Sequence, residues 1–143
     1  MDEPLLIADI GGTNARFALL DDAGNVGPLH RVKLDRFPGI AAATRSFLEA
    51  SGGARTLRGA VLAVAGPVSA NRARLTNRGW VVDGAEIGRA LGIGAVRVVN
   101  DFAAVSWSLP RLAGADLFPL GGEGAGEPGE PMAVLGQIGR AHV

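Results

Sequence analysis

The sequence predicts an α/β protein whose mixed β-sheet is opened by three antiparallel strands. Two observations predict this class. Short apolar runs separated by turn residues fill the first part of the chain, and later apolar runs alternate with segments of helical periodicity. The chain has 143 residues, of which 48% are hydrophobic and 20% are charged. These values are typical of a folded domain with a hydrophobic core.

Three strands are predicted at the N-terminus. Residues 5–10 form an apolar run that ends at a Gly-Gly pair, and residues 15–20 form the second run. A turn over residues 21–25 then leads to a third strand over residues 30–34. Because the connections are short, we expect neighbouring strands to pair antiparallel.

A helix and two further strands follow. The apolar spacing over residues 40–48 predicts a helix that ends near Ser51. Residues 59–65 are a buried strand, and residues 70–75 alternate in polarity as a half-exposed strand would. We expect this last strand to extend the same sheet.

Two more helices flank another buried strand. A capping box that begins at Asp83 predicts a helix that ends at Gly92. Residues 95–100 form a strand that runs directly into Asp101 and a helix, which Pro110 stops. This strand is therefore expected to place Asp101 at the carboxyl edge of the sheet.

The remaining residues carry weaker signals. Phe102, Val105 and Leu109 fall on one face of the predicted helix, which indicates a buried stripe. Residues 121–131 are acidic and rich in glycine and proline, as in a solvated loop. Residues 132–135 are apolar and predict the start of another strand.

Composition and charge exclude several function classes. Lys and Arg number 14 and Asp and Glu also number 14, so no basic field is expected to hold nucleic acid or a membrane surface. Cysteine is absent, which excludes disulfides and thiolate metal sites. No apolar run approaches the roughly 20 residues that span a bilayer, and residues 1–4 lack the basic start of a signal peptide. We therefore expect a cytoplasmic protein.

The segment Asp9-Ile10-Gly11-Gly12-Thr13-Asn14, here called the phosphate turn, combines a carboxylate with a tight glycine turn. Backbone N–H groups in such a turn can bind phosphates, and Asp9 can hold Mg²⁺ directly or through water. The alternative is an ordinary hairpin with glycine at positive φ. The residues alone leave both interpretations open.

Asn100 and Asp101 lie where a buried strand meets a helix, a place where ligands bind in open α/β sheets. A negative side chain is favoured at a helix N-terminus, and a carboxylate there can accept a proton from a bound hydroxyl. The alternative, that Asp101 is only a helix cap, is favoured when this pair is considered alone.

Residues 76–80, here called the sugar-side loop, read Thr76-Asn77-Arg78-Gly79-Trp80. Its amide and hydroxyl groups could face a sugar. The alternative is a β-turn with Trp80 packed into the core, and a single tryptophan is more often packed in this way than placed in a binding site.

Four segments in order resemble the bacterial ATP-dependent glucokinase family. They are Asp9-Ile10-Gly11-Gly12-Thr13-Asn14-Ala15-Arg16, Ala63-Val64-Ala65-Gly66-Pro67-Val68, Leu75-Thr76-Asn77-Arg78-Gly79-Trp80 and Val99-Asn100-Asp101-Phe102-Ala103-Ala104. The resemblance implies an actin/hexokinase-like (ribonuclease H-like) fold in which two α/β domains close on sugar and nucleotide. Four matching segments in order are more specific than any one of them. The resemblance therefore favours the functional interpretations of these residues over the alternatives given above.

The resemblance also implies the roles of individual residues. Asp101 would be the catalytic base for the 6-hydroxyl of glucose, Asn100, Thr76 and Asn77 would bind the sugar, and the phosphate turn (Asp9, Gly11, Gly12, Thr13 and Asn14) would bind ATP, with Mg²⁺ at Asp9. The implied partners are glucose and ATP, with no nucleic acid and no membrane, and the full-length protein would be a homodimer. Two alternatives remain: a non-catalytic sugar-sensing module of the same fold, and a kinase for another hexose.

Family members continue differently after a segment like residues 134–136. We therefore expect residues 1–110 to be a small α/β domain and residues 111–136 to be the start of a larger α/β domain that is truncated here. Residues 137–143 are expected to be a non-native tail, because residues 138–143 resemble the translation of a sequencing-adapter read.

Overall fold

The computed structural model describes residues 3–53, 56–121, 127 and 129–136. The chain divides into two compact units, Met1–Asp101 and Phe102–Val143, called the first and second units below. The predicted boundary after residue 110 concerns the longer protein and stays a prediction. No helix in the described part of the chain is long and apolar enough to cross a membrane.

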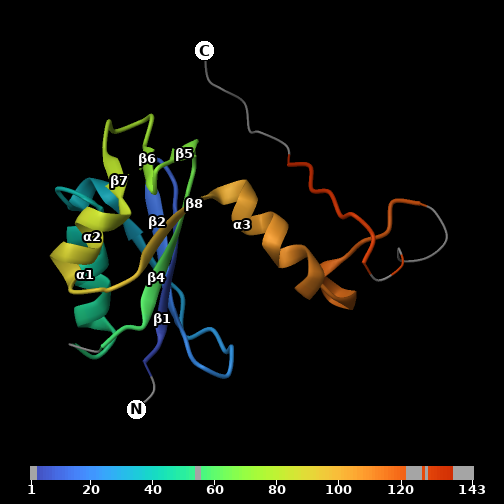
Figure 1. The fold of residues 1–143 in the computed structure, drawn as a ribbon, viewed down its shortest axis with the longest axis horizontal. Coiled ribbons are helices and arrows are strands. Elements are labelled where there is room, and N and C mark those ends of the chain that lie inside the picture. The colour runs from blue at the N-terminus through green and yellow to red at the C-terminus, as the bar shows by residue number, and fades with distance from the viewer. Residues whose placement is uncertain (1–2, 54–55, 122–126, 128, 137–143) are drawn as a thin grey trace. The chain divides into compact units, whose positions relative to one another are not determined.

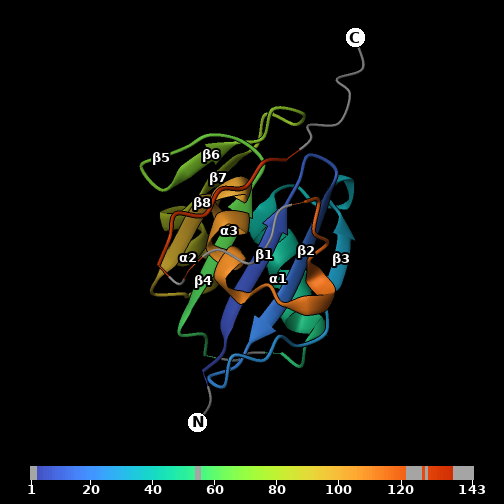
Figure 2. The same cartoon turned by 90° about the vertical axis from the view of Figure 1, so that its right-hand side faces the viewer.

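The first unit is built on a mixed, five-stranded sheet with the order β3-β2-β1-β4-β8 (Figure 1). Its strands are β1 (Leu5–Ile10), β2 (Asn14–Leu20), β3 (His30–Lys33), β4 (Gly59–Val64) and β8 (Val96–Asn100). The first three pair antiparallel, whereas β4 and β8 run parallel to β1, as Figure 2 shows from the face of the sheet. The prediction of a mixed sheet opened by three antiparallel strands is confirmed.

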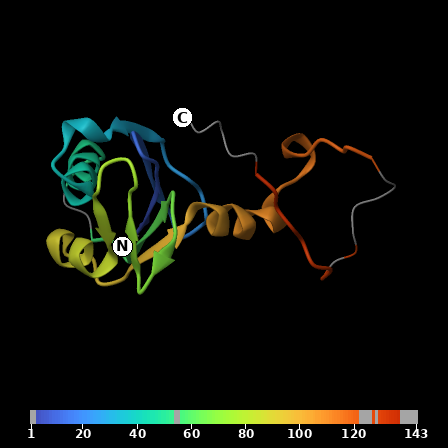
Figure 3. The ribbon, with the colours of Figure 1, turned by 90° about the horizontal axis from the view of Figure 1, so that it is seen from above.

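Two helices, α1 (Ile40–Ala50) and α2 (Gly84–Leu91), cover one face of this sheet (Figures 1 and 3). Alternate side chains of β1, β2 and β4 point toward them and are fully buried, including Leu6, Phe17 and Leu62. Phe17 stacks on Phe47 of α1 with ring centroids 5.4 Å apart. The predicted helix over residues 40–48 is thus confirmed, and it buries its apolar stripe against the sheet.

Residues 70–75 do not extend the large sheet, so this expectation was wrong. They contribute β6 (Arg72–Arg74) to a separate sheet with β5 (Val68–Ser69) and β7 (Val81–Asp83), in the order β5-β6-β7. Ala70 and Asn71 have φ values of 49° and 60°, which form a tight turn between β5 and β6. This turn folds the chain back on itself, so β6 pairs with its sequence neighbours rather than with the large sheet.

Asn71 protects the outer edge of β8. Its side-chain Nδ2 donates to the carbonyl of Val96 (2.9 Å), and its Oδ1 accepts from the N–H of Val98 (2.7 Å). The amide therefore satisfies two backbone groups that an edge strand would otherwise expose.

We expect Asn71→Gly to lower the free energy of unfolding by about 1 kcal/mol or more, because Val98 is buried and its N–H would lose its partner. Glycine tolerates the positive φ, so backbone strain does not contribute to this loss. Urea unfolding measures it, with Ala70→Gly in the same turn as the matched control. Equal stabilities of the two variants would contradict the role given to the amide.

Asp83 caps α2 as predicted, and Gly92 ends the helix in the left-handed conformation. The Asp83 Oδ1 accepts from the N–H groups of Ala85 (2.9 Å) and Glu86 (3.1 Å), and Oδ2 pairs with Arg72 Nε at 2.9 Å. The backbone N–H of Glu86 holds the pKa of Asp83 below its ordinary value of 3.8, with help from Ala85 and Arg72.

A carboxyl group whose pKa is lowered by folding stabilises the fold above its unfolded pKa and loses this contribution as the pH falls through the folded value. We therefore expect the difference in the free energy of unfolding between the parent chain and Asp83→Asn to become smaller as the pH falls below 3.8. Asparagine caps helices about as well as aspartate but does not titrate in this range. Thermal unfolding at several pH values tests this, and a difference that does not change with pH would contradict it.

The second unit has little regular structure. It contains all of helix α3 (Asp101–Ser108) except the first residue, and short 3₁₀ turns at Leu109–Arg111 and Gly114–Asp116. Phe102 and Val105 are exposed, so the predicted buried stripe of this helix is not buried. Helical spacing shows only which residues lie on one face of a helix, and it does not show whether that face is buried. Residues 132–135 form no strand, and residues 137–143, the expected non-native tail, lie outside the described residues.

Candidate active site at the carboxyl edge of the sheet

Three parallel strands end at the same level of the large sheet. Ile10 of β1 is in register with Val64 of β4, and Val64 is in register with Asn100 of β8. Since neighbouring strands lie about 4.8 Å apart, the ends of β1 and β8 are separated by about 10 Å. The phosphate turn after β1 and the pair Asn100-Asp101 therefore lie at one edge, as the sequence predicts for ligand binding.

The phosphate turn is a hairpin that closes on itself. The Gly11 N–H donates to the Asn14 carbonyl (3.0 Å), and the Leu34 N–H donates to the Thr13 carbonyl (2.9 Å). The N–H groups of Gly12 and Thr13 make no hydrogen bond within the described residues. These two N–H groups, rather than that of Gly11, are the donors that the turn can offer to a phosphate.

The close approach of a second loop explains why position 12 is glycine. Neither Gly11 nor Gly12 has a positive φ, so the hairpin alternative with glycine at positive φ does not apply. A Cβ on Gly12 would instead overlap the side-chain amide of Asn77 in the sugar-side loop. Gly12 is therefore the point where this loop packs on the phosphate turn.

A row of three charged side chains crosses the sheet beside the turn. Asp9, Arg16 and Arg31 are cross-strand neighbours in β1, β2 and β3. Arg16 Nη1 and Asp9 Oδ2 are 3.2 Å apart, and both side chains are about half exposed. With the turn they line a hollow of about 320 Å³, whose lining residues are Asp9, Gly11, Gly12, Thr13, Asn14, Arg16 and Arg31. Two guanidinium groups make this hollow suitable for an anion.

Asp9 also fits a magnesium site of the kind used with nucleotides. Mg²⁺ keeps several waters and takes one or two carboxylates plus phosphate oxygens, so a preformed cluster of ligands is not required. In the described part of the chain no group of at least three acidic or histidine side chains could hold a metal. The half-exposed Asp9 carboxylate beside the hollow is consistent with this type of site.

Asn100 is fixed at the end of β8. Its Nδ2 donates to the carbonyl of Gly66 (2.8 Å), the second residue after β4, which has a φ of 145°. The N–H of Ala65 in turn donates to the carbonyl of Ile10 (3.1 Å). Asp101 comes next and begins α3. Backbone and side-chain hydrogen bonds thus connect all three strand ends.

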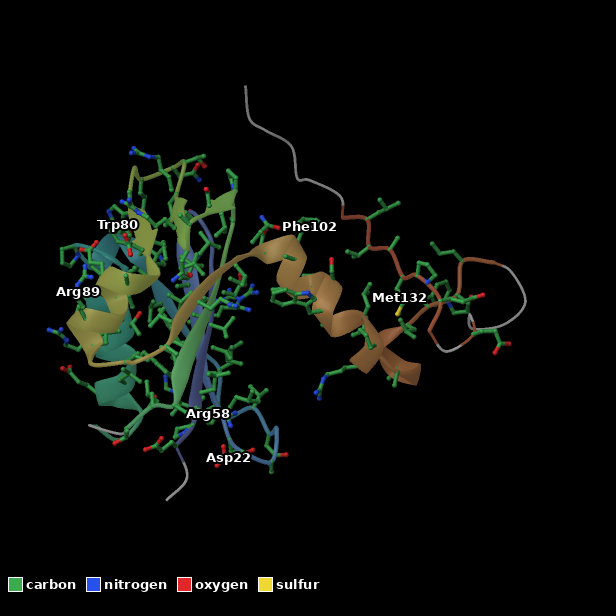
Figure 4. All side chains as sticks on the ribbon, viewed as in Figure 1. Asp22, Arg58, Trp80, Arg89, Phe102 and Met132 are labelled. Atoms are coloured by element: carbon green, nitrogen blue, oxygen red, sulfur yellow. The ribbon has the colours of Figure 1, made fainter. Side chains whose placement is uncertain are left out.

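The sugar-side loop lies between β6 and β7, at the end of the first unit where Figure 4 labels Trp80. Thr76 Oγ1 and Asn77 Oδ1 are 3.3 Å apart, and both residues are exposed. Arg78 Nε donates to the Gly12 carbonyl (3.1 Å), and its guanidinium lies 5.5 Å from the centre of the Trp80 ring. Trp80 is half-buried against the core, so the turn with a packed tryptophan is also correct.

A larger hollow of about 860 Å³ lies elsewhere in the first unit, against α2 and β8. Its lining includes Arg58, Arg89 and Arg97 but none of the residues predicted for the site. The smaller hollow is the better candidate, because it combines a carboxylate, two guanidinium groups and backbone N–H groups that make no hydrogen bond to any described residue.

The structure therefore brings the predicted residues of the phosphate turn, the strand end and the sugar-side loop to one edge of the first unit. Sequence reasoning assigned no role to Arg16, Arg31 or Arg78. Arg16 could have been found, since it lies two residues after Asn14 on the same strand face. Arg31 and Arg78 depend on strand register and on a contact between residues 66 positions apart, which the sequence does not reveal.

Comparisons with known proteins point to one family. The family model described as Glucokinase matches residues 6–139. The glucokinase of Chromobacterium violaceum is 37% identical over 133 residues, which cover 93% of this chain and 38% of that protein. The chain thus spans about two fifths of the length of the curated relatives it matches.

Solved structures share the fold. A glucokinase from an Antarctic psychrotroph superposes with a TM-score of 0.66 at 38% identity, covering 79% of this chain and 37% of that one. A glucokinase from Streptomyces griseus, solved in complex with glucose and AMPPNP, has a TM-score of 0.57 at 23% identity and covers 73% of this chain and 35% of that one. The second likeness supports the predicted actin/hexokinase-like fold class.

Proposed function

The chain belongs to the glucokinase family, and on this premise we propose that it is the N-terminal part of an ATP-dependent hexose kinase that phosphorylates glucose. The observation that carries the proposal is the register of Ile10, Val64 and Asn100. This register puts the phosphate turn and the Asn100-Asp101 pair at one sheet edge, a single strand apart. Phosphoryl transfer requires a phosphate site and a base on the acceptor hydroxyl in line with each other.

In the proposed reaction, Asp101 accepts the proton of the glucose 6-hydroxyl while that oxygen attacks the γ-phosphorus of ATP. The bond from the γ-phosphorus to the bridging oxygen breaks, and ADP and glucose 6-phosphate are formed. Asn100, Thr76 and Asn77 bind the sugar and hold its 6-hydroxyl toward Asp101. Orientation of this kind supplies much of the rate in phosphoryl transfer, because it converts an encounter into an intramolecular step.

The phosphate turn binds the nucleotide in this proposal. The N–H groups of Gly12 and Thr13 donate to phosphate oxygens, and Arg16 adds positive charge beside them. Gly11 and Asn14 close the turn and so fix these donors. Asp9 would hold Mg²⁺, directly or through water, and the ion would neutralise charge on the phosphates when bound.

We further propose that the full-length protein acts in the cytoplasm as a homodimer, with glucose and ATP as partners and without nucleic acid or membrane binding. The balanced charge of the chain supports the last point. Light scattering of the purified full-length protein measures the subunit number.

The test of the function is a kinase assay of the full-length protein. ATP-dependent formation of glucose 6-phosphate, with glucose preferred over fructose, mannose and N-acetylated amino sugars, would support the proposal. A preference for one of those other sugars would instead support a kinase for another hexose. Glucose binding without any phosphoryl transfer would support the sugar-sensing alternative and contradict the proposal.

A further inference from the structure

The sugar-side loop and the phosphate turn belong to different sheets, yet they are joined by direct contacts. The loop connects β6 to β7 in the small sheet, whereas the turn connects β1 to β2 in the large sheet. Arg78 Nε donates to the carbonyl of Gly12 at 3.1 Å across 66 positions of sequence. The Asn77 amide packs on Gly12 from the same loop. Two neighbouring side chains thus touch one residue of the turn.

The Arg78 side chain is held in place from several sides. The Arg78–Gly12 hydrogen bond is partly buried, so water competes for it less than at an open surface. The guanidinium also lies 5.5 Å from the centre of the Trp80 ring, an arrangement that orients the cation over the aromatic face. Trp80 itself packs against the hydrophobic core. Arg78 is therefore supported by the core and can hold the Gly12 carbonyl in one orientation.

The peptide group between Gly12 and Thr13 links the Arg78–Gly12 hydrogen bond to phosphate binding. A peptide group is planar and trans, so the Gly12 carbonyl and the Thr13 N–H point in opposite directions. Fixing the carbonyl toward Arg78 therefore also fixes the direction of the Thr13 N–H. Thr13 lines the hollow beside Asp9 and Arg16, and its N–H makes no hydrogen bond within the described residues. Arg78 thus fixes the orientation of a backbone donor that belongs to another residue, the N–H of Thr13.

We infer that Arg78 is a positioning residue that couples the sugar-side loop to the phosphate turn, so that glucose in the loop strengthens nucleotide binding at the turn. The inference rests on the proposed function. A sugar that contacts Thr76 or Asn77 restricts the loop from which Arg78 extends, and this restriction reaches the Gly12–Thr13 peptide through the guanidinium. Because coupling between two sites is reciprocal, the nucleotide also strengthens glucose binding by the same factor.

The experiment uses the full-length protein and calorimetry. The affinity for AMPPNP with Mg²⁺ is measured with and without saturating glucose in the parent, Arg78→Gln and Arg78→Lys. Arg58→Gln is the matched control, since Arg58 pairs with Asp22 at the opposite end of the first unit, as Figure 4 shows. Thermal unfolding of each variant separates a loss of coupling from a loss of fold.

We expect glucose to raise the AMPPNP affinity of the parent and of Arg58→Gln by about fivefold or more, the lower end of typical site-to-site couplings. Arg78→Gln should lose most of this factor while its glucose affinity without nucleotide and its melting temperature stay near those of the parent. Arg78→Lys should recover part of the factor, because lysine can still donate to the Gly12 carbonyl but lacks the planar group.

A coupling factor in Arg78→Gln equal to that of the parent would overturn the inference, and so would a parent without coupling. A general loss of glucose affinity and thermal stability in Arg78→Gln would mean that Arg78 is only structural, which also overturns it. The proposed function fails separately, when the parent forms no glucose 6-phosphate from ATP and glucose.

Discussion

In the full-length protein, Asp101→Asn is expected to lower kcat at least about 100-fold, the lower bound for general-base catalysis. Asparagine matches aspartate in size, and Asp101 is the first residue of α3, where losing the charge removes only a modest interaction with the helix dipole, so folding should be retained. It cannot accept the proton of the glucose 6-hydroxyl as that oxygen attacks phosphorus. The loss should therefore fall on kcat, while the affinity for glucose changes little.

Steady-state kinetics and calorimetric glucose binding on both proteins measure the effect. Asp22→Asn is the matched control, because Asp22 is an exposed aspartate that pairs with Arg58 far from the sheet edge (Figure 4). The control should keep the kcat of the parent. If Asp101→Asn also stays within a few-fold of the parent, Asp101 only stabilises the start of α3 and another group is the base.

Local patterns predict the large sheet and its helices well. The three opening strands, the helix capped by Asp83 and the strand that leads into Asp101 lie within a few residues of their predicted positions. Each depends on information that is local in sequence: alternation of polarity, a capping side chain or a turn between apolar runs. The physical causes act over a few residues, so the sequence reveals them.

The small sheet was harder to predict because its strands are only two or three residues long. Such strands have no periodicity, and they form here because the turn at Ala70 and Asn71 brings β5 and β6 together. The Asn71 side-chain amide then makes hydrogen bonds to the backbone of β8 at the edge of the large sheet. The turn is local, but the contacts of Asn71 with Val96 and Val98 join segments 25 and 27 positions apart and cannot be inferred from local patterns.

The site shows the same division between local and distant information. The phosphate turn and the Asn100-Asp101 pair could be predicted as segments, because each combines a strand end with polar side chains. The packing of Asn77 on Gly12 and the hydrogen bond from Arg78 join loops of different sheets. These contacts show why position 12 is glycine, which neither a phosphate motif nor a hairpin turn explains by itself.

The chain of residues 1–143, expressed by itself, is expected to form no measurable glucose 6-phosphate from ATP and glucose. It contains the proposed base and one phosphate turn, but it spans about two fifths of the curated relatives that it matches. In the proposed reaction, the remaining part supplies the other wall of the cleft, which orients both substrates and excludes water. Without that wall the reaction loses a positioning contribution that is worth up to about 7–11 kcal/mol in well-oriented reactions.

A coupled assay compares this chain with the full-length protein at equal concentration and with a sample that contains no protein. Circular dichroism and thermal unfolding establish that the chain is folded under the assay conditions, so that inactivity reflects an incomplete site. The same assay on the chain with Asp101→Asn identifies contaminating kinases, since their activity does not depend on this residue. Product formation by the chain that disappears in the Asp101→Asn chain would show that the first unit holds a complete catalytic site, and the expectation would then be wrong.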